Sequence, residues 1–329
     1  MNIKNIKPRK LLWGVSGCGR FAETSFIPAM SLVHKSKITA LFSHEKNRAK
    51  SLADKFGIAN FYNSYEEFLS SDIDCVYVSS SNNNHFEHVI KAAKAGKHIL
   101  CEKPLALTSA QALEMVKVCE DNNVQLAVNY VHRFHPLVVK AKEIIKSRMI
   151  GKLVNINLSF NVDYPPGGNF RFTKSLSGGG ALRDIGTHMI DLLRFFGGEI
   201  ENVQGTLDNI IYKSEVDDFA AALVKFKESG YGYFNVSFNN KRAFNRVEIL
   251  GHQGAISIEK LIASRFVPTK LTILLEGEAK KAFRKRANKQ VHLLKSIQDS
   301  FLKNETPMVT GMDGYINMLH MEELEIYGK

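Results

Sequence analysis

The feature that most constrains the fold is a regular alternation of short apolar segments and helical segments between residues 11 and 128. The stretches between the apolar runs have the spacing of amphipathic helices, and the runs have the length of buried strands. Strands that alternate with helices form a parallel sheet with crossover helices. We therefore predict a doubly wound α/β domain, with strands at "LLWGV", "ITALFS", "DCVYVSS", "HILC" and "VQLAVN".

A glycine-rich loop, "GVSGCGRFA", follows the first of these strands and opens the first helix. It contains Gly17-x-Gly19-x-x-Ala22, the G-x-G-x-x-G/A form of the dinucleotide fingerprint. Gly17 permits the tight turn, Gly19 lets the backbone approach a pyrophosphate, and Ala22 lets the helix lie close to the strand. The pyrophosphate then meets unpaired N–H groups at the start of the helix. The position of the loop predicts a Rossmann domain that binds a dinucleotide.

The pattern changes after residue 150. Period-2 alternation in "LVNINLSF", "DDFAAALVKF" and "GYGYFNVSF" predicts antiparallel strands, interrupted by a helix around residues 183–196. We expect a Rossmann domain over residues 1–128 and an α+β domain for substrate binding and oligomerisation over residues 129–329, built on a large open, mainly antiparallel sheet. The terminal "GMDGYINMLHMEELEIYGK" is helical by its spacing, and we expect it to pack back on the first domain. The open sheet is the predicted interface of a homodimer or homotetramer.

Composition limits the classes of protein to which this chain can belong. The 329 residues are 44% hydrophobic, enough for two cores, and the four cysteines show neither a CxxC pair nor a metal-ligand spacing. The apolar stretch near the N-terminus is too short for a signal peptide or a membrane span. We predict a cytoplasmic protein with reduced cysteines, no bound metal and no membrane partner.

The net charge of +11 raises nucleic acid and anionic small molecules as partners. The densest basic run is "KKAFRKRANK" at residues 280–289. A solvated helix face or loop is the favoured interpretation of this run, because no zinc-finger, helix-turn-helix or RNA-binding signature accompanies it. We therefore expect no nucleic-acid partner.

Four segments carry a resemblance to a known family: "GVSGCGRFA", "DCVYVSSSNNNH", "AGKHILCEKPLALT" and "GGGALRDIGTHMIDLLRFFG". In order and spacing they resemble the glucose-fructose oxidoreductase, inositol dehydrogenase and MocA (Gfo/Idh/MocA) family over nearly the whole chain. The resemblance implies NAD(P)-dependent oxidation or reduction of a sugar, polyol or related hydroxy compound. One departure is Ser80-Ser81-Asn82, where the family often has Thr-Pro-Asn, although His85 is in the expected place.

Within this resemblance, "HILCEKP" ends a central strand of the sheet, and the carboxyl ends of such strands face the cofactor crevice. Glu102 and Lys103 are then expected where nicotinamide and substrate meet, rather than as a surface ion pair. Pro104 cannot extend the ladder, so the strand ends there.

The helix after "GGG" supplies the other candidate catalytic groups. Asp184 and His188 are four residues apart and so share a helix face, with Asp191 about two turns from Asp184. We predict His188 as general acid/base, with an ionisation near neutral pH, and Asp184 as its partner or a ligand of a substrate hydroxyl. Lys103 would polarise the substrate oxygen or carry the proton itself. In the structural alternative Asp184 caps the helix and His188 is a core histidine; Arg133 and Arg171 are expected to be structural or to shape the pocket.

Cofactor choice depends on the end of the second strand, where NAD-selective domains have an acidic residue. This chain has Ser43 and His44 there, with Glu45 after them and Arg48 further on, which favours NADP over NAD. Together with the resemblance, this predicts the following cofactor contacts: Gly17, Cys18, Gly19, Arg20, Phe21, Ser43, His44, Arg48, Ser80, Asn82, His85, Glu102 and Lys103.

Two other functions stay open at this point. The same fold serves non-enzymatic dinucleotide-binding sensors, although the joint presence of Lys103, Asp184 and His188 favours an enzyme. A nucleic-acid binder that uses residues 280–289 is the third possibility. The substrate, the carbon oxidised and the direction are not specified, and the positive charge makes phosphorylated or nucleotide-linked sugars worth screening.

Overall fold

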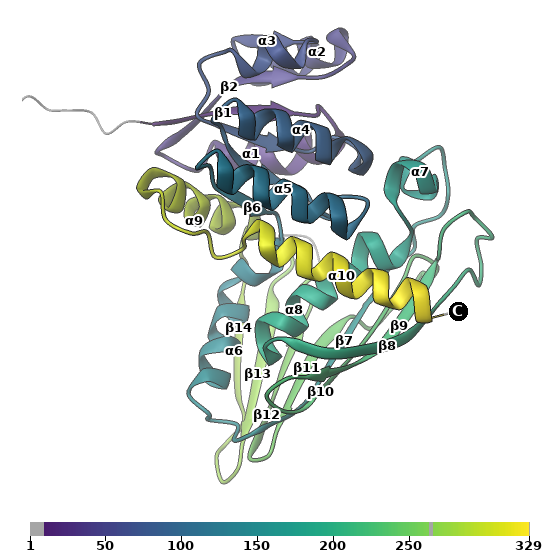
Figure 1. Cartoon of the computed structure of the whole chain (residues 1–329). Helices are drawn as coiled ribbons and strands as arrows, with labels where there is room; N and C mark the ends of the chain where they lie inside the picture. The colour runs from purple at the N-terminus through teal and green to yellow at the C-terminus, as the bar shows by residue number, and fades with distance from the viewer. Residues whose placement is uncertain (1–9, 263–265, 329) are drawn as a thin grey trace, which may run out of the picture. The chain divides into compact units, whose positions relative to one another are not determined.

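The computed structural model describes residues 10–262 and 266–328, which form two compact units (Figure 1). Unit 1 contains the described residues up to Glu102, together with Leu113–Asn129 and Gln290–Gly311. Unit 2 contains Lys103–Ala112, Tyr130–Lys289 and the described residues from Met312 onward.

Unit 1 is built on a six-stranded, entirely parallel sheet. In spatial order its strands are β3 (Asn60–Tyr62), β2 (Ser36–Phe42), β1 (Leu11–Ser16), β4 (Cys75–Val78), β5 (His98–Cys101) and β6 (Leu126–Val128). The five predicted strands are confirmed, and β3 is a short strand that the pattern did not predict. Every residue of β4 is buried, as expected for the centre of a parallel sheet that is covered on both faces.

The helices of unit 1 follow the strands in the order expected for crossover connections, and one comes from far along the chain. Trp13 of β1 stacks on Phe301 at 5.9 Å between ring centroids, and Phe26 stacks on Tyr77 at 3.6 Å. These ring pairs join the sheet to its first and last helices, so the late helix is part of this core. The helices are η1 (Ala22–Phe26, a π-helical turn), α1 (Ile27–Met30), α2 (Lys46–Phe56), α3 (Tyr65–Leu69), α4 (Asn82–Lys94), α5 (Ser109–Asp121) and α9 (Lys289–Lys303).

Unit 2 is built on an eight-stranded mixed sheet. Its spatial order is β14 (Lys281–Lys285), β13 (Thr269–Leu275), β12 (Gly254–Glu259), β11 (Arg246–Gly251), β7 (Leu153–Asn161), β10 (Tyr231–Ser237), β9 (Phe219–Phe226) and β8 (Ile200–Asp208). The predicted antiparallel pairing is confirmed except between β7 and β10, which run parallel. Two antiparallel meanders, β8–β10 and β11–β14, thus meet at β7.

Helices cover one face of this sheet. α8 (Thr187–Gly197) packs on β7 and β10, and α6 (Pro136–Lys146) packs on β12, β13 and β14. The helix predicted at 183–196 is confirmed as η4 (Leu182–Gly186, a second π-helical turn) followed by α8, and the terminal helix is confirmed as α10 (Gly311–Tyr327). The predicted docking of α10 on the first domain stays a prediction. Short turns complete the unit: η2 (Val131–Phe134), η3 (Phe170–Phe172) and α7 (Lys174–Ser177).

The opposite face of the same sheet is exposed in the single chain. Tyr231 of β10, Leu250 of β11 and Leu274 of β13 are each between 39% and 50% exposed. Asn155 is paired with both Tyr231 and Leu250, and Ala255 with both Leu250 and Leu274, so these residues form one row across five strands. The row mixes apolar and polar side chains in the way that protein interfaces do.

The basic run at residues 280–289 differs from its prediction. Residues 281–285 are neither a helix face nor a loop but form β14, the edge strand of the sheet, and all five are exposed. Lysine and arginine on an edge strand discourage pairing with another chain, which accounts for much of this charge without a ligand.

Candidate active site

The glycine loop of unit 1 has a backbone that only glycine fits at its first position. Gly17 has a φ of +102°, and a Cβ there would lie 2.5 Å from the amide nitrogen of Ser80. Its N–H donates to the carbonyl of Phe42 at 2.9 Å, which ties the loop to the end of β2. At Gly19 a Cβ would meet no atom within 4 Å, so the space beside this position is open. The loop therefore fits a dinucleotide whose pyrophosphate approaches the backbone at Gly19.

Arg48 of α2, the helix that follows β2, contacts this loop. Its Nε donates to the carbonyl of Cys18 at 2.9 Å, so the guanidinium lies beside the glycine loop although the side chain is exposed. His44 packs edge-on against Phe42 at 5.1 Å between ring centroids, and the Oγ of Ser43 accepts from the amide of Glu45. Four of the predicted cofactor residues, Cys18, Ser43, His44 and Arg48, are thus gathered near the carboxyl end of β2.

A histidine of α4 that the sequence prediction missed, His88, contacts both the end of β1 and the loop after β4. His88 is buried, and its Nδ1 lies 3.0 Å from the Oγ of Ser16 and 3.1 Å from the Oγ of Ser80. Burial lowers the pKa of His88 to about 4, so its ring is neutral at neutral pH. His85 is also buried, with Nε2 3.1 Å from the carbonyl of Ser80. The spacing H-x-x-H in α4 was the available signal, because it places both rings on one helix face.

Other predicted cofactor residues take up places around this edge. Arg20 and Phe21 are exposed and come directly before η1, and Asn82 is the first residue of α4. The carboxylate of Glu102 accepts from the hydroxyl of Tyr77 at 2.5 Å and from the amide of Asn129. Glu102 is therefore held in place at the end of β5.

The candidate catalytic groups come together in unit 2, around Asp184. The ammonium of Lys103 lies 2.7 Å from Oδ1 of Asp184 and also 2.7 Å from its main-chain carbonyl. The Nε of Arg171 lies 3.2 Å from Oδ2. Burial alone would raise the pKa of Asp184, but Lys103 and Arg171 hold it below its usual range. The carboxylate is thus ionised, and it fixes the position of the Lys103 ammonium.

The contacts of Asp184 differ from one of the two roles predicted for it. Asp184 lies in the π-helical turn η4, whose i→i+5 hydrogen bonds alter the angular spacing expected of an α-helix. No hydrogen bond joins Asp184 to His188 in the described part of the chain, and the carboxylate is paired with Lys103 and Arg171 instead. The Nδ1 of His188 is buried and has no hydrogen-bond partner among the described residues.

The glycines before this helix are explained by their close packing against Asp217. Asp217 accepts from the amide of Gly180 and the amide of Leu182, both at 2.8 Å, and so caps η4 from a neighbouring segment. A Cβ on Gly180 would lie 1.8 Å from the carbonyl oxygen of Asp217. The run "GGG" therefore permits the close approach that fixes the start of the helix carrying Asp184.

The electrostatics of His188 correct the expectation of an ionisation near neutral pH. Burial and the positive charges of Lys103 and Lys289 lower its pKa well below the usual histidine range, against the opposing effect of Asp184. The imidazole is therefore neutral at neutral pH, the form that can accept a proton.

Two residues of this cluster were missed by the sequence prediction. The ammonium of Lys289 donates to the carbonyl of Leu261 at 2.6 Å and lies 3.3 Å from Nδ1 of His132. The ring of His132 packs edge-on against that of His188, with centroids 4.7 Å apart. Lys289 closes the basic run and His132 precedes Arg133, so neither stood out from its neighbours in the sequence.

Asp191 lies in a buried ion pair. It is 1% exposed and receives both Nε and an Nη of Arg133, at 2.9 and 2.6 Å. This buried, two-pronged ion pair favours the structural interpretation of Arg133 over a role in the substrate pocket.

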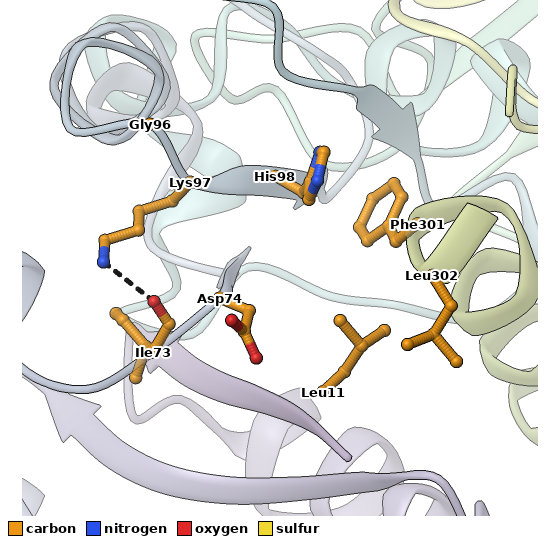
Figure 2. A pocket seen from close by; sticks show the side chains of 8 residues that line it. All are labelled: Leu11, Ile73, Asp74, Gly96, Lys97, His98, Phe301 and Leu302. Carbon is orange, nitrogen blue, oxygen red and sulfur yellow. Dashed lines mark hydrogen bonds between the residues drawn. The ribbon is translucent and has the colours of Figure 1, made fainter. Parts of the chain in front are cut away.

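One pocket of about 430 Å³ lies elsewhere in unit 1 (Figure 2). It is lined by residues at the amino ends of β1 and β5, including Leu11 and His98, and by Phe301. Figure 2 shows the ammonium of Lys97 donating to the carbonyl of Ile73, at 2.8 Å. Ligands of doubly wound sheets bind at the carboxyl ends of the strands, so this pocket is not the candidate active site.

None of the helices in the described residues has both the length and the apolar character that a membrane-spanning helix requires.

Comparisons with known proteins agree with both units. Residues 11–130 match a family described as "Oxidoreductase family, NAD-binding Rossmann fold", and residues 138–257 match the GFO/IDH/MocA C-terminal domain. A 1,5-anhydro-D-fructose reductase of Ensifer adhaerens is 29% identical over 306 residues, which is 92% of this chain and 91% of the relative. An uncharacterized oxidoreductase of Streptococcus pneumoniae serotype 4 is 31% identical over 75% of this chain and 68% of the relative. The crystal structure of an aldose-aldose oxidoreductase from Caulobacter crescentus matches with a TM-score of 0.89 and 23% identity, over 97% and 98% of the two chains.

Proposed function

The chain belongs to the Gfo/Idh/MocA family of NAD(P)-dependent oxidoreductases, and from that premise we propose that it interconverts a hydroxyl and a ketone on a sugar or polyol. The observation that carries the proposal is the contact between Lys103 and Asp184 in one cluster with a neutral His188. The named relatives are oxidoreductases, and two have sugars in their names, which favours an enzyme over a non-enzymatic sensor.

Each chemical role follows from what its side chain can do. A bound nicotinamide supplies the hydride acceptor or donor. In the direction of oxidation, His188 would take the hydroxyl proton, because its ring is neutral and can accept one. Lys103 would donate a hydrogen bond to the same oxygen and stabilise its developing negative charge. Asp184 positions that ammonium through two contacts, at its carboxylate and its carbonyl.

The choice between His188 and Lys103 as the proton carrier is part of this proposal. We assign the proton to His188 because its imidazole can accept one, whereas the ammonium of Lys103 donates to the carboxylate and the main-chain carbonyl of Asp184. A neutral lysine would be needed for it to act as the base.

We propose NADP(H) as the preferred cofactor. The support is Arg48, which is anchored beside the glycine loop by its contact with Cys18 and which can bind a 2′-phosphate. Ser43 and His44 follow β2 with no carboxylate at the strand end. Glu45 is exposed and is the nearest residue that could instead bind a ribose hydroxyl.

We also propose that the exposed sheet face of unit 2 is the interface of a homodimer or homotetramer. The row through Tyr231, Leu250 and Leu274 supplies apolar area of the kind that interfaces bury. Tyr231→Glu combined with Leu250→Glu should then give a monomer in light-scattering chromatography. The cytoplasmic location stays a prediction from the sequence.

The experiment that tests the function is a turnover screen. Purified protein is mixed with NAD⁺ or NADP⁺ and each of a panel of sugars and polyols, and reduced cofactor is followed by its absorbance. Turnover of at least one sugar that is lost in His188→Asn supports the proposal. Dinucleotide binding without turnover of any member, in either direction, would instead favour a sensor.

A further inference from the structure

Lys289 occupies an electrostatically unfavourable place. It is half-buried and is the first residue of α9, whose first turn contains no acidic residue. A helix N-terminus carries partial positive charge, so an ammonium there is repelled rather than stabilised. Within the described residues no carboxylate lies within ion-pair distance of it, and burial lowers its pKa to about 8. A residue that breaks a local rule in this way is often placed for function.

The surroundings of Lys289 are positive as well. Lys103 and Arg171 both pair with the carboxylate of Asp184. The pKa of His132 is lowered by its burial and by Lys289, His188 and Lys103, so its ring is neutral and does not offset the positive charges around it. Lys289 thus adds a further positive charge to a cluster that already contains Lys103, in a partly buried place. Such a charge is costly unless an anion binds beside it.

Lys289 and His132 also have hydrogen-bond donors to offer. An ammonium has three N–H groups, and one donates to the carbonyl of Leu261. With Nδ1 of His132 accepting from Lys289, the proton of the neutral ring is on Nε2, which becomes a donor. The pair can thus direct a charged N–H and a neutral N–H at a bound oxygen.

We infer that Lys289 and His132 form a subsite for an anionic substituent of the substrate, a carboxylate or a phosphate on the sugar or polyol. The inference rests on the proposed function and narrows its substrate class. The edge-on contact of His132 with His188 places this subsite beside the proposed base, so the anionic group would be bound close to the reacting carbon. Carboxylate and phosphate share the oxygen chemistry that such donors recognise.

A different role for the pair would be a proton relay from His188 to solvent. A relay would act on every substrate alike, whereas a subsite acts only on substrates that carry the anion. Loss of Lys289 should therefore weaken the reaction of all substrates equally if the pair is a relay, and mainly that of anionic substrates if the pair is a subsite.

The test uses matched sugars and matched variants of the full chain. The sugars are glucose and galactose, their uronates and their 6-phosphates. The variants are Lys289→Gln, which keeps donors but removes the charge, Lys289→Arg, which keeps the charge, and the control Lys285→Gln, at an exposed lysine of the same basic run. Calorimetric binding to the NADP(H)-saturated protein and kcat/KM are both measured, so the test does not depend on turnover alone.

We expect at least one anionic sugar to bind the wild type about tenfold or more tightly than its neutral parent. Lys289→Gln should lose about 10- to 100-fold for that sugar and less than about threefold for the parent, the scale of one charge-assisted contact. Lys289→Arg should keep most of the preference, and Lys285→Gln all of it.

Equal losses for neutral and anionic sugars in Lys289→Gln would overturn the subsite and favour the relay. A wild type that binds no uronate or phosphate more tightly than its neutral parent would also overturn the subsite. Failure of the proposed function looks different, because no sugar would be turned over even where the anionic sugars bind. Anionic preference in wild-type binding that Lys289→Gln removes would uphold the subsite in that case too.

Discussion

The two units build their sites from different material. In unit 1 the candidate site for the pyrophosphate is backbone: a glycine loop with a positive φ at Gly17 and open space at Gly19, at the ends of neighbouring strands. In unit 2 the site is made of side chains drawn from distant segments, with Lys103 paired to Asp184 and His132 stacked edge-on against His188. A site made of backbone needs only small residues at the correct spacing, whereas a site made of side chains needs the whole tertiary fold. Substitutions in unit 1 should therefore change cofactor binding, and substitutions in unit 2 should change the rate.

The largest effect that separates the two sites is expected at His188. His188→Asn removes the proposed base and should lower kcat by about 1,000-fold, within the range for loss of a general acid/base. In the wild type the rate of oxidation should stay level as pH falls through 6.5 and decline only at lower pH, because the pKa of His188 is well below its usual range. The exposed His34→Asn is the control. A decline centred near pH 6.5 would place the ionisation on another group.

The next effect is on binding alone. Gly19→Val should weaken NADP(H) binding by about 100-fold or more, because the new side chain would fill the space through which the pyrophosphate approaches. Its melting temperature should stay within about 2 °C of wild type, since a Cβ there meets no protein atom. Gly17→Val, in contrast, should lower the melting temperature as well, because its Cβ would collide with the backbone at Ser80. Normal dinucleotide affinity in Gly19→Val would contradict the backbone account of this site.

A smaller effect concerns the choice of cofactor. Wild type should prefer NADP(H) to NAD(H) by about tenfold or more in kcat/KM, and Arg48→Ala should reduce that ratio through NADP(H) only. Lys50→Ala, at an exposed lysine of the same helix, should leave the ratio unchanged. A preference of the wild type for NAD(H) would shift the recognition from Arg48 to Glu45.

The smallest effect is on stability, and both units contribute to it. His88, His132 and His188 have pKa values below the usual range when folded, so the unfolded chain takes up protons first as pH falls below about 6.5. The free energy of unfolding should therefore fall between pH 7 and pH 5, by roughly 1 to 2 kcal/mol for each such histidine. His88→Gln should reduce this dependence in urea titrations, and an unchanged dependence in that variant would show that His88 binds its proton equally well in the folded and unfolded chains.

Sequence patterns predicted the parallel sheet and the glycine loop of unit 1 because the determinants of both are local. The spacing of the strands and the glycines of one loop predict the dinucleotide-binding loop. "HILC" predicts a strand and "GGG" precedes a predicted helix, and each of these signals lies within one short segment. The contacts of Asp184 were not predictable from the four-residue spacing, because a π-helical turn alters that geometry. Lys289 and His132 become neighbours only through folding. No pattern in the basic run predicts β14, because lysine has a low strand propensity, and pairing with β13 overrides that propensity.

The most direct test of this division of labour is a pair of measurements on Lys103→Met. The dissociation constant for NADPH is measured by fluorescence titration, and kcat is measured with the best sugar from the screen. The account predicts a dissociation constant within about twofold of wild type and a kcat lower by about 100-fold, because Lys103 belongs to the side-chain cluster around Asp184. Lys94→Met, an exposed lysine in unit 1, should change neither value. A loss of NADPH affinity that matches the loss of rate, or a kcat near wild type, would contradict the claim that unit 2 supplies the chemistry and unit 1 the cofactor.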